Sequence, residues 1–107
     1  MDAIAVRTGQ LVVLRGRLEA AAGCGTAREV LHAALEAGQG DLVVDIRGLE
    51  RIDLAGLGVL LAVHRRASGL GRRMVLRSVP PRMARVLART RFERIFAIES
   101  AIPATAA

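Results

Sequence analysis

The sequence predicts an α/β fold, a mixed β-sheet of about four to five strands covered by about three to four helices, in the order β-β-α-β-α-β-α. After an initial pair of strands, β-prone runs alternate with helical patterns, which is typical of a sheet with helices packed on it. The chain has 107 residues, 52% apolar and 24% charged, which is the composition of one packed domain over residues 1–107. Only Phe92 and Phe96 are aromatic, so we expect an aliphatic core.

The first expected elements are a hairpin and an amphipathic helix. The runs Ile4 to Arg7 and Leu11 to Arg15 are β-prone and closely spaced, which favours two strands joined by a short loop. Residues 26–37 carry apolar side chains at helical spacing, with Thr26 or Gly25 near the helix start. The inward-facing side chains of this helix are expected to be Ala27, Val30, Leu31, Ala34 and Leu35.

A central strand and a second helix follow. Leu42 to Ile46 is a nearly continuous apolar run, which is typical of a central strand covered on both faces. The second helix begins after Asp53 and is ended by Gly69 and Gly71. Its apolar arc is wide, which predicts burial on more than one side, and comprises Leu57, Val59, Leu60, Leu61, Val63 and His64.

The last part of the chain predicts one more strand and one more long helix. Arg73 to Arg77 is the strand, and Pro80-Pro81 begin the third helix, at the position where proline costs least. We expect Met83, Val86, Leu87 and Thr90 to face inward on this helix. A short final helix or turn then brings Phe92, Ile95 and Phe96 onto the end of the core.

The positive charge is concentrated in the second half of the chain. The formal net charge is +6 and is carried by Arg alone, because the sequence contains no Lys. Residues 1–53 contain six Arg and eight acids, whereas residues 54–107 contain ten Arg and two acids. Arg82, Arg85 and Arg89 form an outward stripe on the third helix, and DNA binding through this stripe is our third hypothesis. A solvated helix face that meets an acidic protein is the favoured interpretation, and the lack of Tyr and Trp argues against binding of single-stranded nucleic acid.

Catalytic and metal-binding patterns are weak. Cys24 is the only cysteine, so no disulfide is expected, and a reducing, cytoplasmic location is favoured. His32 is expected to be solvated and His64 partly buried, without the spacing of metal ligands or of a Cys-His nucleophile pair. Gly23-Cys24-Gly25 lacks the third glycine of a phosphate-binding loop. We therefore expect no metal, no cofactor, no membrane span and no enzymatic activity.

The stretch from Asp45 to Arg66 is the most informative part of the chain. Asp53 stands where its carboxylate can accept from the amide of Ala55 or Gly56 and cap the second helix. Gly56 and Gly58 permit a close backbone approach at this turn. The turn is therefore a candidate site for another protein to dock or for a phosphoryl group to be placed.

In this context the sequence resembles the STAS domain, the fold of bacterial anti-sigma-factor antagonists. Gly16 to Glu19 is similar to the family's G-E-L-D turn, and Leu42 to Ile46 to its L-V-L-D-L strand. Ile52 to Leu61 resembles its I-D-S-S-G-L-G-V-L-L segment, and Met74 to Phe96 its next strand and helix. The resemblance implies a STAS-like sheet and a protein-binding role without catalysis.

The resemblance also implies a partner and a site. Family members bind an anti-sigma factor that is a serine kinase, and phosphorylation of the second Ser of D-S-S-G ends binding. Here that position is Ala55, so the usual phosphorylation is not expected. The implied partner-binding residues are Asp53, Leu54, Ala55, Gly56, Leu57, Gly58 and Glu19.

A second hypothesis remains open. STAS-like accessory subunits with D-x-A-G in place of D-S-S-G bind the ATPase of a bacterial lipid-transport ABC system, and this chain is similar to them at Ala55-Gly56-Leu57. Leu54 departs from that variant, which commonly carries Thr there.

Overall fold

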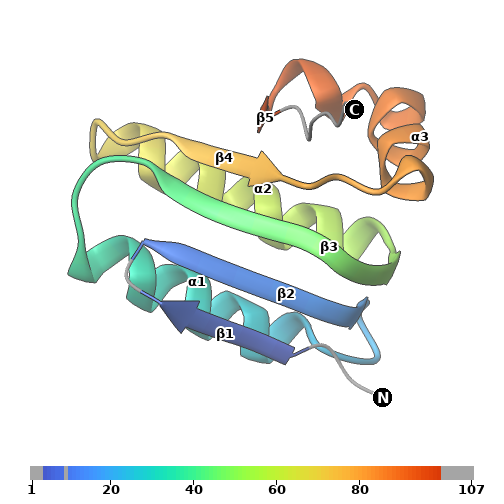
Figure 1. The fold of residues 1–107 in the computed structure, drawn as a ribbon, viewed down its shortest axis with the longest axis horizontal. Helices are drawn as coiled ribbons and strands as arrows, with labels where there is room; N and C mark the ends of the chain where they lie inside the picture. Colours follow the sequence, from blue (N-terminus) through green and yellow to red (C-terminus); the bar gives the residue numbers. More distant parts are fainter. Residues whose placement is uncertain (1–3, 9, 100–107) are drawn as a thin grey trace, which may run out of the picture.

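The computed structural model describes residues 4–8 and 10–99, and Figure 1 shows their arrangement. The predicted order of elements is confirmed, including a short helix near the end, and one further strand follows it. The elements are β1 (Ile4–Thr8), β2 (Leu11–Leu18), α1 (Cys24–Ala37), β3 (Leu42–Ile52), α2 (Leu54–Gly69), β4 (Met74–Arg77), α3 (Pro81–Thr90), a 3₁₀ helix η1 (Phe92–Arg94) and β5 (Ala97–Glu99).

The sheet is mixed, as predicted. Its strands lie in the order β1-β2-β3-β4-β5, with β3 at the centre. β1 pairs antiparallel with β2 as a hairpin, and β2, β3, β4 and β5 are mutually parallel. β5 had no sequence signal of its own, because it has three residues and two of them are exposed.

Helices α1 and α2 lie on the same face of the sheet (Figure 1). Side chains of β3 that point toward them, Leu42, Val44 and Ile46, are buried, whereas the alternating Val43 and Asp45 are only half-buried. The prediction that this strand is covered on both faces is therefore wrong. Val43 and Asp45 lie on the face of the sheet that does not carry α1 and α2 (Figure 1), where they are half-buried.

Two elements begin or end differently from the prediction. α1 starts at Cys24 rather than near Thr26, because Gly23 adopts the left-handed conformation (φ 92°) and its carbonyl accepts from the amide of Ala27 at 2.9 Å. β3 continues to Ile52, because β2 stays paired with it through two register shifts.

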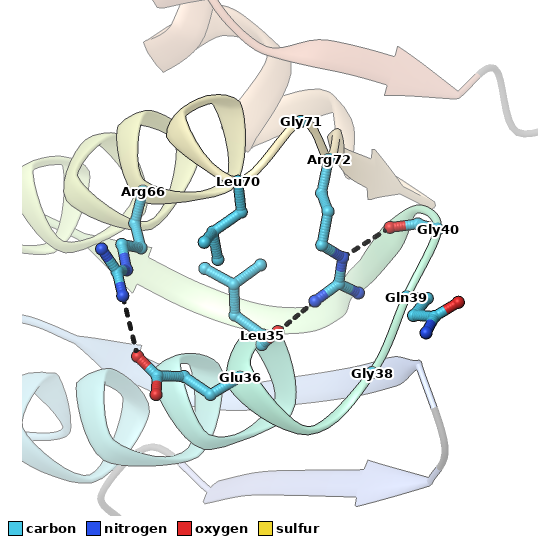
Figure 2. A pocket seen from close by; sticks show the side chains of 9 residues that line it. All are labelled: Leu35, Glu36, Gly38, Gln39, Gly40, Arg66, Leu70, Gly71 and Arg72. Carbon is cyan, nitrogen blue, oxygen red and sulfur yellow. Dashed lines mark hydrogen bonds and ion pairs between the residues drawn. The ribbon is translucent and has the colours of Figure 1, made fainter.

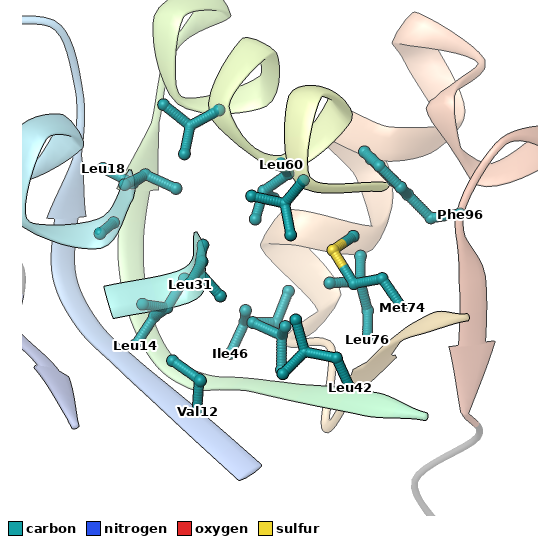
Figure 3. Close-up of a cluster of buried hydrophobic side chains, with 14 of the residues drawn as sticks. Val12, Leu14, Leu18, Leu31, Leu42, Ile46, Leu60, Met74, Leu76 and Phe96 are labelled. Carbon is teal, nitrogen blue, oxygen red and sulfur yellow. The ribbon is translucent and has the colours of Figure 1, made fainter. Parts of the chain in front are cut away.

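The core is aliphatic, as predicted, with Phe96 at its edge (Figure 3). The ring of Phe96 makes edge-to-face contacts with His64 at 5.8 Å and with Phe92 at 5.7 Å between ring centroids. Met83 and Leu87 face inward on α3 as predicted, and Val86 and Thr90 are half-buried. Ile95 was expected to pack on the core and is instead exposed, because the turn after η1 directs only Phe96 inward.

Candidate functional site

Asp53 fixes the start of α2. Its Oδ1 accepts from the amide of Gly56 at 2.9 Å, which confirms the predicted helix cap. Its Oδ2 accepts from the amide of Ala20 at 3.0 Å, in the loop between β2 and α1. The backbone adds to this connection, since the amide of Asp53 donates to the carbonyl of Leu18 at 3.3 Å. One side chain thus holds two loops together at the carboxyl ends of β2 and β3.

These hydrogen bonds also set the charge of Asp53. The amide of Ala20, followed by that of Gly56, lowers the pKa of this carboxyl from its ordinary value. Asp53 is therefore ionised at neutral pH and faces the positive end of α2. Because both oxygens already accept from backbone amides, its structural role is established, and a direct contact between Asp53 and a partner stays a prediction.

Gly56 permits the close approach of α2 to β2 within the fold, a role that the sequence did not predict. A Cβ atom at this position would lie 2.1 Å from the carbonyl oxygen of Leu18 and 2.7 Å from Cγ1 of Ile52. Neither contact is sterically allowed, so only glycine fits here. At Gly58 a Cβ atom would meet nothing within 4 Å, so the fold itself does not require glycine there, and the close approach of a partner at Gly56 and Gly58 stays a prediction.

The first turn of α2 presents apolar atoms to solvent. The side chain of Leu54 is 78% exposed, and Ala55 and Gly58 are also exposed. Leu57, expected at this surface, is 2% exposed and belongs to the core, and Gly56 is buried as well. The exposed side chains at this turn are therefore those of Leu54 and Ala55, and Asp53 beside them is half-buried.

Glu19 lies next to the turn and is held by two arginines. Its carboxylate is 3.3 Å from Nε of Arg51 and 3.8 Å from Nη1 of Arg17, and its side chain is 17% exposed. Its backbone exchanges hydrogen bonds with Ala22 in the same loop. The prediction that Glu19 contacts a partner is untested, and its visible role is to brace the loop beside Asp53.

Cys24 is buried, and the two histidines are half-buried on separate helices. Burial, followed by the negative charge of Asp53, raises the pKa of the Cys24 thiol, which disfavours the nucleophilic thiolate. His64 is half-buried, as predicted, and His32 is also half-buried rather than fully solvated. Within residues 4–8 and 10–99, no three His, Cys, Asp or Glu side chains are grouped as metal ligands. No helix in this part of the chain is long and apolar enough to span a bilayer.

Arg72 braces the opposite end of the sheet and was missed by the sequence analysis. Its guanidinium donates to the carbonyl of Gly40 at 2.8 Å, to the carbonyl of Leu35 and to Oε1 of Gln10. Figure 2 shows it beside a pocket of about 450 Å³ between the ends of α1 and α2. No local pattern could indicate this role, because the three acceptors are brought to Arg72 only by the fold.

Comparison with known proteins gives the class and then the family. The parallel strands with α1 and α2 on one face (Figure 1), and a capped turn at the start of α2, define a small α/β domain. A family model described as "Mlab, STAS domain" matches residues 5–99. The chain therefore belongs to the STAS domain family, and the resemblance stated from the sequence is confirmed. No curated protein matches its sequence.

Solved structures share the fold. A proposed anti-sigma-factor antagonist from Thermotoga maritima superposes with a TM-score of 0.76 at 22% identity, covering 94% of this chain and 87% of that chain. A variant of RsbS from Moorella thermoacetica gives a TM-score of 0.68 at 26% identity, with 94% and 87% covered. A sulfate transporter family protein from Wolinella succinogenes gives 0.70 at 16% identity, with 90% and 81% covered.

Proposed function

We propose that this protein is a non-enzymatic, cytoplasmic regulator that binds an anti-sigma factor of the serine-kinase type through the start of α2. The observation that carries the proposal is the exposure of Leu54, which is 78% exposed at the end of a helix that Asp53 and Gly56 hold in place. Burial of this apolar side chain against a partner would be favourable, and its rigid support keeps the ordering cost of binding low. The likeness to anti-sigma-factor antagonists supports this choice of partner.

The proposed interface lacks the family's usual switch. Ala55 lies in the first turn of α2 and is exposed, so a serine at this position would be accessible to a kinase. Alanine has no hydroxyl group, so no phosphate can be added there to repel the partner. We therefore propose that binding is constitutive and is controlled by the amount of partner present.

A charge substitution at Ala55 tests this interface. Ala55→Asp places a carboxylate where a phosphate would stand, and an acidic residue in the first turn of a helix is compatible with folding. We expect the affinity for the cognate kinase, measured by calorimetry, to fall by about tenfold or more. The matched control is Ala33→Asp, on the exposed side of α1, which should leave the affinity unchanged. Unchanged affinity in Ala55→Asp would place the interface elsewhere.

The lack of phosphorylation has its own test. Incubation of the wild-type protein with the kinase and ATP should leave it unlabelled, whereas Ala55→Ser should become labelled at residue 55. Incorporation of phosphate at a serine or threonine elsewhere in the wild-type protein, with a loss of affinity for the kinase, would contradict the proposal.

A role as accessory subunit of a lipid-transport ABC system is the second candidate. It is favoured by Ala55 within Asp53-Leu54-Ala55-Gly56, which fits the D-x-A-G variant, and by a family description that names Mlab rather than an anti-sigma-factor antagonist. Co-purification separates the two candidates, because the transport role requires an ATPase and a permease and the regulatory role requires a kinase-fold protein.

A further inference from the structure

A groove lies between the second half of β3 and the start of α3. The pairing of β3 with β4 ends at Asp45 and Arg77, whereas its pairing with β2 continues to Ile52. In the described part of the chain, the edge of β3 that faces α3 therefore has no strand partner beyond this point. The groove has a volume of about 480 Å³ and is lined by Arg47, Gly48, Leu49, Glu50, Pro80, Pro81, Arg82 and Arg85.

The groove is positively charged. Arg47 comes from β3, Arg82 and Arg85 come from α3, and Glu50 is the single acid in the lining. Arg47 donates to Oγ of Ser78 at 3.4 Å and Arg82 to the carbonyl oxygen of Glu50 at 3.3 Å, so both acceptors are neutral. Among the described residues, none of these three arginines forms an ion pair. Because a guanidinium has five N–H donors, most of their binding capacity faces the groove or solvent.

The start of α3 adds to the positive electrostatic potential of the groove. The helix is preceded by Pro80, which provides no side-chain cap, and its first turn contains no acidic residue. The positive end of the helix is therefore uncompensated next to Arg82 and Arg85. This effect is secondary to the three guanidinium groups and acts in the same direction.

The groove continues toward the turn at Asp53. A second hollow, of about 400 Å³, shares Glu50 and Arg82 with the first. It extends along Ile52 to Glu19, which lies beside Asp53, and its apolar lining includes Met83 and Val86. A segment in the groove could thus belong to the same partner that contacts Leu54.

We propose that this groove binds an extended acidic segment of the partner protein. The carboxylates of the segment are bound by Arg47, Arg82 and Arg85, and its backbone runs beside the unpaired edge of β3. The inference rests on the proposed function, since it assumes a protein partner, and it defines the chemistry of that partner. A groove that contains Glu50 and does not include Arg89 fits a peptide better than duplex DNA.

The test uses the full chain and a synthetic probe. The probe is a short fluorescein-labelled peptide of alternating Glu and Thr, and the control peptide carries Gln in place of Glu. Fluorescence anisotropy should detect the Glu peptide and not the Gln peptide, with an affinity that falls as salt rises. We expect Arg85→Glu to weaken binding about tenfold. Arg89→Glu is the matched control, because it is exposed on the same helix outside the groove, and it should change the affinity by less than about twofold.

Several results would overturn the inference. One is an equal loss of peptide affinity in Arg85→Glu and Arg89→Glu. The others are the absence of peptide binding to the wild type and displacement of the peptide by duplex DNA or inorganic phosphate at equal concentration. Ala55→Asp separates this inference from the proposed function. It should lower the affinity for the kinase while leaving peptide binding intact. If Arg85→Glu binds the peptide like the wild type, the proposed peptide site in the groove is wrong. If Ala55→Asp binds the kinase like the wild type, the proposed interface at the start of α2 is wrong.

Discussion

At each end of the sheet, one charged side chain holds two segments together through hydrogen bonds, but the two ends differ in how far their leucine side chains are exposed. At the carboxyl ends of β2 and β3, Asp53 joins the loop at Ala20 to the start of α2. At the opposite end, Arg72 joins the end of α1 to the loop before β3. Leu54 is 78% exposed at the first end, whereas Leu70 is 45% exposed at the second. Both ends are therefore rigidly supported, and the larger exposed apolar area at Leu54 is what distinguishes the proposed binding site from the Arg72 end.

The largest effect is expected at Gly56. Gly56→Ala places a Cβ atom against the carbonyl of Leu18, so α2 must move away from β2, and we expect the free energy of unfolding to fall by about 3 kcal/mol. Gly58→Ala is the matched control, since it fills open space within the same helix and should raise the free energy of unfolding by about 0.5 kcal/mol or more. Urea denaturation measures both. Equal effects of the two substitutions would disprove the close approach.

A smaller loss is expected at Arg72. Arg72→Ala leaves the carbonyls of Leu35 and Gly40 without this donor and should lower the free energy of unfolding by about 2 kcal/mol. The control Arg65→Ala, on an exposed position of α2, should change it by less than about 0.5 kcal/mol. The affinity of Arg72→Ala for the partner should stay at the wild-type value. A loss of affinity without a loss of stability would move the binding site to this end of the sheet.

The Asp53 end was largely predictable from sequence, because its determinants are local. A capping Asp followed three residues later by Gly is visible in the chain itself, and the carboxylate does accept from Gly56. For Leu57, helical periodicity and family resemblance gave opposite indications. Its spacing with Leu60 predicted burial, which the structure confirms, whereas the motif placed it at the partner surface.

The Arg72 end and the groove were not predictable, because their determinants are non-local. Arg72 and its acceptor Gln10 are 62 positions apart. The continuation of β3 to Ile52 depends on pairing with β2 across two register shifts, while the local sequence Arg47-Gly48 indicates a strand end. The outward stripe on α3 was correctly predicted as exposed, yet only the fold shows that Arg82 and Arg85 line a groove that Arg89 does not.

The smallest expected effect is the pH dependence of stability that the carboxylate of Asp53 gives to its end of the sheet. The pKa of Asp53 is lower in the folded protein than its unfolded value of about 3.9, so its carboxylate stabilises the fold above that pH. This contribution is lost as the pH falls through the folded pKa. Asp53→Asn keeps one acceptor oxygen but no charge, so its free energy of unfolding should lie below that of the wild type. This difference should be constant near neutral pH and shrink below about pH 4. Thermal unfolding across this range measures it, and a deficit that grows in acid would contradict the assignment.

Exposed leucines at the two ends provide the most direct test of the central claim, which is that the start of α2 binds the protein partner. Leu54→Gln and Leu70→Gln make the same change at exposed positions and should both leave the fold intact. Calorimetric titration with the co-purified partner is expected to show that Leu54→Gln weakens binding by about tenfold or more. Leu70→Gln should bind like the wild type. Equal affinities for the two variants, or a larger loss in Leu70→Gln, would contradict the account.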